Sequence, residues 1–405
     1  MTYEHVRSYE LRDSWKETNR TWGHSLHSTC SRTGSFPPSL AHFFIKKFSS
    51  LEGKVLDPFS GKGTAPLEAC LAGRIGIGND IAPEAFILTH SKVRPVSLMR
   101  FQEYLQGKKK EIDNTIEDVD VNEVADNVEV FYHPETLRQI IAVKNAVKND
   151  NSDEGIFLKA LMCGILHGSS EISLSLPCSH SYSMSPNYVK EYTKKHNLIR
   201  PKRNVIHCLI KKAKTVLSDG LPQVRGRAYQ LDARSLPLEN EFIDLIVTSP
   251  PYFNAQTYAW DNWLRLWFLG YDFKEVRKKL VQTGSKRKYG KFLKESMREM
   301  FRVLDDNRAC FIVVGDVKIG EETINTAEFL APLAESVGFS VRHIIDDTIP
   351  KESKYLTYVA EKDKGITIDR ILALEKGDVR QSDEKIDWDV PLSSSPQRML
   401  DRFVS

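Results

Sequence analysis

The chain has 405 residues, of which 41% are hydrophobic and 27% are charged, and its formal net charge is +3. No apolar run approaches the roughly 20 residues that a membrane-spanning helix needs, and the polar N-terminus lacks the apolar stretch of a secretion signal. We therefore expect a cytoplasmic protein without a membrane partner. The six cysteines are scattered and form no CxxC pair, which argues against a zinc site or a disulfide framework, so we predict no metal.

Strand-like apolar runs alternate with helical runs along much of the chain. Helical patterns at 64–73, 292–304 and 326–339 separate several of the strand candidates. This alternation predicts an α/β fold with seven strands in a mostly parallel sheet and helices on both faces. The seven predicted strands are residues 54–59, 74–80, 225–233, 242–252, 308–316, 340–350 and 369–377.

Between the second and third predicted strands the pattern changes to amphipathic helices, at 99–119 and 134–150, and a more buried one at 154–168. We predict that residues 96–219 form a largely helical inserted module. The predicted catalytic domain comprises residues 1–95 and 220–380, and residues 381–405 are expected to form an irregular tail.

A glycine loop, DPFSGKGT (residues 57–64), joins the first predicted strand to a helix. Glycines at Gly61 and Gly63 let the backbone approach a ligand and adopt positive φ. The loop lacks the GxxxxGK[ST] spacing of a phosphate loop, which argues against an NTPase. Asp57 at the end of the strand would repel a pyrophosphate but accept a hydrogen bond from a cationic amine.

Two further acids end the next two strands. Asp80 stands where an acidic residue typically binds ribose hydroxyls, and Asp232 could accept from an adenine amino group. Together with Asp57 they suit a nucleoside that carries an amino-acid tail, which is the shape of S-adenosylmethionine. A dinucleotide would add a pyrophosphate.

The fourth predicted strand runs into TSPPY, residues 248–252, a turn stiffened by two consecutive prolines. DPFSGKGT together with TSPPY resembles the amino-methyltransferases of DNA, and the serine form of the second motif is most similar to the N4-cytosine branch. GSFPPSLAHFFI, residues 34–45, resembles the segment that wraps the methionine end of the cofactor in those enzymes. The resemblance covers roughly residues 20–95 and 220–377 and implies a class I, Rossmann-like methyltransferase fold with S-adenosylmethionine as cofactor.

The resemblance also implies roles for individual residues. The implied base-holding residues are Ser249, Pro250, Pro251 and Tyr252. The implied cofactor-binding residues are Phe36, Pro37, Asp57, Pro58, Phe59, Ser60, Gly61, Gly63, Thr64, Asp80, Ile81, Asp232, Ala233 and Thr248.

The chemistry of the TSPPY loop agrees with these roles. An exocyclic amine is a poor nucleophile because its lone pair is delocalised into the base. Ser249 and the carbonyl of Pro250 could accept its two N–H bonds, and rigid prolines would keep these acceptors fixed. Tyr252 offers a stacking face for a base rotated out of the duplex. Because this loop holds a serine where a C5-cytosine enzyme needs a cysteine, we expect Cys178 to be structural.

Three basic clusters are candidates for contact with double-stranded DNA. For residues 107–110 we expect a solvated helix face, whereas residues 194–203 and 274–291 combine charge with polar and aromatic neighbours suited to phosphate and base contacts. His24 and His27 could face the ligands, and they could equally be satisfied surface histidines. The predicted DNA-binding residues are Lys195, Arg200, Lys202, Arg203, Lys286, Arg287 and Lys288.

The leading hypothesis is therefore methyl transfer to N4 of cytosine, in a restriction–modification or solitary role, with a cognate restriction endonuclease as a candidate partner. The alternatives left open are an adenine-N6 enzyme, a tRNA base-amine enzyme and an inactive methyltransferase fold that serves as a DNA-recognition subunit. No RNA-binding module is evident, and an inactive subunit would have no need for Gly61, Gly63, Ser249 and Tyr252.

Overall fold

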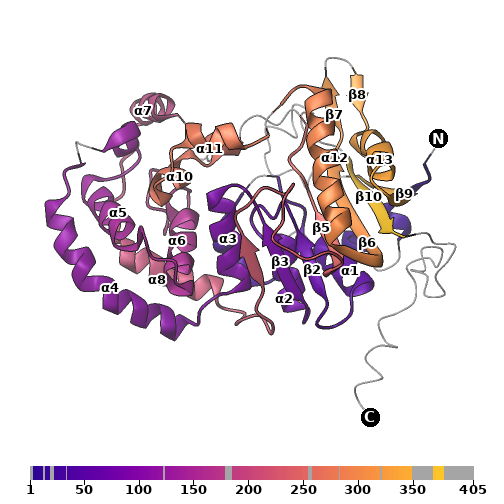
Figure 1. Cartoon of the computed structure of the whole chain (residues 1–405). Helices are drawn as coiled ribbons and strands as arrows, with labels where there is room; N and C mark the ends of the chain where they lie inside the picture. Colours follow the sequence, from indigo (N-terminus) through magenta and orange to yellow (C-terminus); the bar gives the residue numbers. More distant parts are fainter. Residues whose placement is uncertain are drawn as a thin grey trace, which may run out of the picture.

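The computed structural model describes ten segments of the chain, and the predicted tail at 381–405 and Cys178 lie outside them. A central eight-stranded sheet has the order β1-β9-β10-β6-β5-β2-β3-β4 (Figure 1). The strands are β1 (His5–Arg7), β2 (Lys54–Asp57), β3 (Ile75–Asn79), β4 (Arg227–Tyr229), β5 (Ile243–Thr248), β6 (Leu304–Gly315), β9 (Phe339–Thr348) and β10 (Ile368–Lys376). The described residues are 3–11, 14–18, 22–32, 34–121, 124–177, 185–253, 258–281, 283–319, 322–348 and 368–377.

All seven predicted strands are present, and the mostly parallel α/β sheet is confirmed. Strand β10 runs antiparallel to both of its neighbours, and every other pairing in the sheet is parallel. The carboxyl ends of the parallel strands β2, β3, β4 and β5 therefore lie side by side. The glycine loop and TSPPY both leave the sheet at these carboxyl ends.

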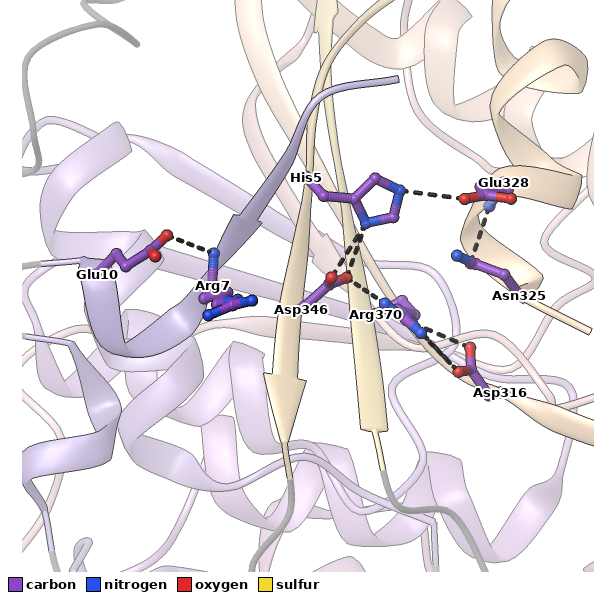
Figure 2. Close-up of polar contacts among 8 residues, drawn as sticks. All are labelled: His5, Arg7, Glu10, Asp316, Asn325, Glu328, Asp346 and Arg370. Atoms are coloured by element: carbon purple, nitrogen blue, oxygen red, sulfur yellow. Dashed lines mark hydrogen bonds and ion pairs between the residues drawn. The ribbon is translucent and has the colours of Figure 1, made fainter. Parts of the chain in front are cut away.

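The prediction of seven strands was one too few, because β1 adds an eighth at the edge of the sheet. Figure 2 shows a chain of polar contacts that fixes it: His5 Nδ1 lies 3.1 Å from Asp346 Oδ1 and its Nε2 lies 3.2 Å from Glu328 Oε1. Arg370 on β10 forms ion pairs with both Asp346 and Asp316. A small hairpin of β7 (Val317–Ile319) and β8 (Glu322–Ile324) follows β6 and was also not predicted.

Helices cover both faces of the sheet, as predicted. Successive residues of a strand point to opposite faces, so Leu245 packs in the hydrophobic cluster under α1 (Pro38–Phe48) while Ile246 packs under α12 (Lys286–Val303). The helix α2 (Thr64–Leu71) lies beside α1, and α13 (Thr326–Glu335) lies beside α12 (Figure 1). The described helices therefore bury both faces of the sheet.

Helices form the second part of the molecule, on the side of α3 (Pro83–Val93) away from the sheet (Figure 1). In the described residues between 98 and 216 there are helices and no strands. The hydrophobic core of these helices also contains Trp263, Leu264 and Trp267, which the sequence did not predict. No described helix is long and apolar enough to span a membrane. The helices of this part are α4 (Leu98–Asp118), α5 (Pro134–Val147), α6 (Asp153–Ile165), α7 (Pro186–Lys195), α8 (Val205–Val216), α9 (Tyr258–Asp261), α10 (Trp263–Leu269) and α11 (Phe273–Lys279).

Candidate active site

A cavity that is partly open to solvent lies where the glycine loop and TSPPY leave the sheet. Its wall contains most of the residues predicted for cofactor and base, although these come from distant parts of the sequence. Pro37, Gly63, Thr248 and Tyr252 are not in the wall. The predicted residues that line it are Phe36, Asp57, Pro58, Phe59, Ser60, Gly61, Thr64, Asp80, Ile81, Asp232, Ala233, Ser249, Pro250 and Pro251.

The glycine loop has a backbone that only glycine adopts easily. Gly61 has φ +51° and Gly63 has φ +76°. A Cβ at Gly63 would lie 2.9 Å from the backbone Cα of Thr89, and a Cβ at Gly61 would lie 2.7 Å from Arg32 Nη1. Both glycines are therefore required by conformation, and Gly63 is also required by space, because its close neighbour is backbone.

Asp57, at the end of β2, is almost completely buried beside the cavity. Its Oδ1 accepts hydrogen bonds from Thr248 Oγ1 at 2.6 Å and from the amide of Phe59 at 3.1 Å. Within the described residues its Oδ2 accepts none, so this oxygen is available to a ligand. Burial raises the pKa of Asp57 to about 7. Thr248, although not in the wall, holds Asp57 in place.

Asp80 and Asp232 are already engaged within the protein. Asp80 accepts from the amides of Gly61 and Ala82, each at 2.9 Å, and so shapes the glycine loop. Asp232 forms an ion pair with Arg234 at 2.7 Å, which holds the pKa of Asp232 below its usual range. A hydrogen bond from an adenine amino group would have to share the Asp232 carboxylate with Arg234.

The TSPPY loop is fixed from two sides. Tyr289 donates a hydrogen bond to the carbonyl of Pro251 at 3.0 Å. The hydroxyl of the half-buried Tyr252 donates to Asp369 at 3.4 Å. In the described part of the chain, the Ser249 hydroxyl and the Pro250 carbonyl have no hydrogen-bond partner, and both residues line the cavity. These two acceptors are therefore free to bind a substrate.

Sequence reasoning missed several residues of the wall. Arg32 precedes the predicted wrapping segment by two residues, and Gly34 and Ser35 begin it, so adjacency was a usable signal. Lys62 lies between the two glycines. The rest come from α12 and from the end of α11, which no sequence pattern connects to the glycine loop. The missed residues are Arg32, Gly34, Ser35, Lys62, Lys279, Leu280, Val281 and Phe292.

His24 and His27 do not line the cavity. His27 is largely buried, so the surface interpretation was wrong for this residue. Its Nε2 lies 2.6 Å from Glu68 Oε1, and burial lowers the pKa of His27 to about 4. His24 accepts a hydrogen bond from the amide of Leu26.

The basic residues predicted to contact DNA lie outside the cavity wall. Arg200 donates to the carbonyl of Glu129 at 3.0 Å, and Lys202 forms an ion pair with Glu135. The side chains of Lys286, Arg287 and Lys288 at the start of α12 are exposed, and so are those of Lys195, Arg200 and Lys202. Contact with DNA remains a prediction for all seven residues, Lys195, Arg200, Lys202, Arg203, Lys286, Arg287 and Lys288.

A family model described as DNA methylase matches residues 2–90 and 243–399, which is more than half of the chain. No curated protein matches this chain. Among solved structures, TrmN from Thermus thermophilus is 13% identical, with a TM-score of 0.35, and the match covers 87% of this chain but only 52% of TrmN.

Two other solved structures cover more of their own length. A SAM-dependent methyltransferase from Methanosarcina mazei is 10% identical over 82% of this chain and 96% of its own, with a TM-score of 0.34. The rRNA methyltransferase AviRa from Streptomyces viridochromogenes is 9% identical over 86% and 91%, with a TM-score of 0.32. TM-scores this low establish nothing about the site.

Proposed function

Because the chain belongs to the DNA methylase family, we propose that it transfers a methyl group to the exocyclic N4 amine of cytosine in DNA. Membership makes it a methyltransferase with S-adenosylmethionine as its cofactor. The choice of DNA, of cytosine and of the N4 atom is our proposal. The serine at position 249 supports the cytosine assignment.

One observation carries the proposal: a single cavity is lined both by the glycine loop with its strand-end acids and by Ser249, Pro250 and Pro251. The donor-binding and acceptor-binding residues therefore face the same space, as a direct transfer requires. The residues fit the cofactor. The free Oδ2 of Asp57 suits an ammonium group, and Asp80 lies near enough to the glycine loop to hold both that loop and a ribose hydroxyl.

When bound, the cofactor supplies an electrophilic methyl group on a sulfonium sulfur. The Pro250 carbonyl and Ser249 Oγ accept the two N–H bonds of the target amine, which draws its lone pair out of the ring and towards the methyl carbon. The cofactor would supply the methyl group and leave as S-adenosylhomocysteine, and the methylated amine would give up one of its two original N–H protons to solvent. Tyr289 and the stiffness of the prolines keep both acceptors in place during this step.

Three alternatives remain. Adenine also presents an exocyclic amine, so an adenine-N6 enzyme needs the same loop, and a tRNA base-amine enzyme would use the same chemistry. An inactive DNA-recognition subunit is disfavoured, because three cavity acceptors have no partner among the described residues, and recognition alone does not need them.

The test is to incubate the protein with methyl-labelled S-adenosylmethionine and either duplex DNA or tRNA, digest to nucleosides and identify the product. We expect label in N4-methyldeoxycytidine and none with Ser249→Ala. N6-methyldeoxyadenosine, labelled tRNA or no label would each select one of the alternatives. A restriction–modification role further predicts that the methylated DNA resists a cognate endonuclease.

A further inference from the structure

A cation and a helix N-terminus meet in the cavity wall, and the sequence predicted the helix start at Thr64 but not the cation. Arg32 lines the cavity beside the glycine loop, and so does Thr64, the first residue of α2. The side chain of Arg32 is only 11% exposed. Its Nη1 lies close against Gly61, since a Cβ at that glycine would come within 2.7 Å of it.

Arg32 is held in this position from behind. Its Nη2 forms an ion pair with Glu84 Oε1 at 3.3 Å, and Glu84 itself is buried in the first turn of α3. The preceding residue is also fixed, because Arg265 of α10 donates to the carbonyl of Ser31 at 2.7 Å. The helical part of the molecule thus places the guanidinium before any ligand arrives, which reduces the entropy lost on binding.

The start of α2 offers a second feature suited to an anion. Its N-cap is Gly63, which provides no side-chain cap, so the first amides of the helix receive no side-chain acceptor there. Thr64 is 2% exposed, and in the described residues its hydroxyl has no hydrogen-bond partner although it is buried. A helix N-terminus favours negative charge, and an unpaired buried hydroxyl calls for a partner.

We propose that Arg32 and Thr64 form the subsite for the carboxylate of the methionyl end of the cofactor, while Asp57 faces the ammonium group of the same end. The inference rests on the proposed function, because it needs the cofactor to occupy this cavity. The planar guanidinium presents paired donors that match a carboxylate. Arg32 is thus a binding residue that Glu84 positions.

The test compares two ligands by titration calorimetry: S-adenosylhomocysteine, and its decarboxylated analogue that keeps the amine. The wild-type protein should bind the first more tightly. Arg32→Gln should lower the affinity for S-adenosylhomocysteine by about 10- to 100-fold. It should leave the affinity for the decarboxylated analogue unchanged. Thr64→Val should act in the same direction, less strongly.

Arg225→Gln is the matched control, because Arg225 also pairs with a carboxylate, Asp153, at 3.3 Å, but lies outside the cavity wall. It should change neither affinity. Arg32→Gln leaves the buried Glu84 carboxylate unpaired, which could unfold the protein. The double variant Arg32→Gln, Glu84→Gln avoids this charge. It should show the same loss of affinity as Arg32→Gln if that loss comes from the missing guanidinium.

Two kinds of result would overturn the inference. Equal weakening of both ligands by the Arg32 variants, or equal affinity of the wild type for both, would show that Arg32 does not read the carboxylate while the cavity still binds the nucleoside. Failure of the wild type to bind either ligand would instead overturn the proposed function, and this inference with it.

Discussion

The pKa of Asp57 predicts how cofactor binding depends on pH. Burial raises this pKa from an ordinary 3.8 to about 7. Below pH 7 the carboxyl is therefore neutral in the free protein, and it must release a proton before it can pair with an ammonium group. Each pH unit below the pKa costs about tenfold in affinity. Half of the carboxyl is ionised at pH 7 and about 1% at pH 5, so we expect S-adenosylhomocysteine to bind about 50-fold more weakly at pH 5 than at pH 7.

The assay is calorimetry from about pH 5 to pH 7.5, below the range of about 7.7 to 8.0 where the α-amino group of the ligand loses its own proton. Titrations at pH 6 in buffers of different ionisation enthalpy should show about one proton released per ligand bound. Methylthioadenosine lacks the amine, so its affinity should stay flat. Asp57→Asn should lower the affinity for S-adenosylhomocysteine and make that affinity independent of pH.

Stability should change in the opposite direction. Asp57 has a higher pKa in the folded than in the unfolded protein, so its contribution to stability is greatest at low pH and is lost as the pH rises towards 7. At pH 8 the folded protein carries the full cost of a buried charge. Asp57→Asn should therefore melt at a higher temperature than the wild type at pH 8, a gain in stability at the expense of binding.

Particular results would refute this reasoning. Flat affinity for S-adenosylhomocysteine across the range would mean that Asp57 is already ionised at pH 5 or does not meet the amine. A pH dependence that survives Asp57→Asn would belong to another group. Lys92 and Asp369 also have a pKa of about 7, but neither lines the cavity.

Two further predictions concern the loop and the rim. Gly63→Ala should lower the melting temperature and abolish binding of S-adenosylhomocysteine, because its Cβ would meet the backbone of Thr89 at 2.9 Å; normal binding would show that the loop can relax. Replacing Lys286, Arg287 and Lys288 by alanine should lower the affinity for duplex DNA of any sequence. The slope of the logarithm of the binding constant against the logarithm of salt concentration should become shallower by about 2 to 3. An unchanged slope in filter-binding titrations would remove α12 from the DNA interface.

The sequence predicted those parts of the fold and site that local patterns encode. Strands β5 and β6 contain apolar runs that are visible in the sequence, and Gly61, Asp57 and Ser249 lie in short motifs at strand ends. By contrast, β1 has three residues and pairs with β9 more than 330 positions away, so nothing near His5 indicates a strand. The packing of Trp263 with the helical part is equally non-local, since it depends on how the chain returns after TSPPY.

Thr248 shows what the structure adds to a motif. The resemblance made it a cofactor contact, yet it is fully buried and absent from the cavity wall. Its hydroxyl instead donates to Asp57, from β5 to the neighbouring β2, at 2.6 Å. The next residue is Ser249, so one hydrogen bond fixes the acid that faces the cofactor relative to the loop that faces the base. A valine would fill the same space but remove a donor from the ionised carboxylate, which would raise the pKa of Asp57 further and weaken the donor side of the site through a residue that touches neither substrate.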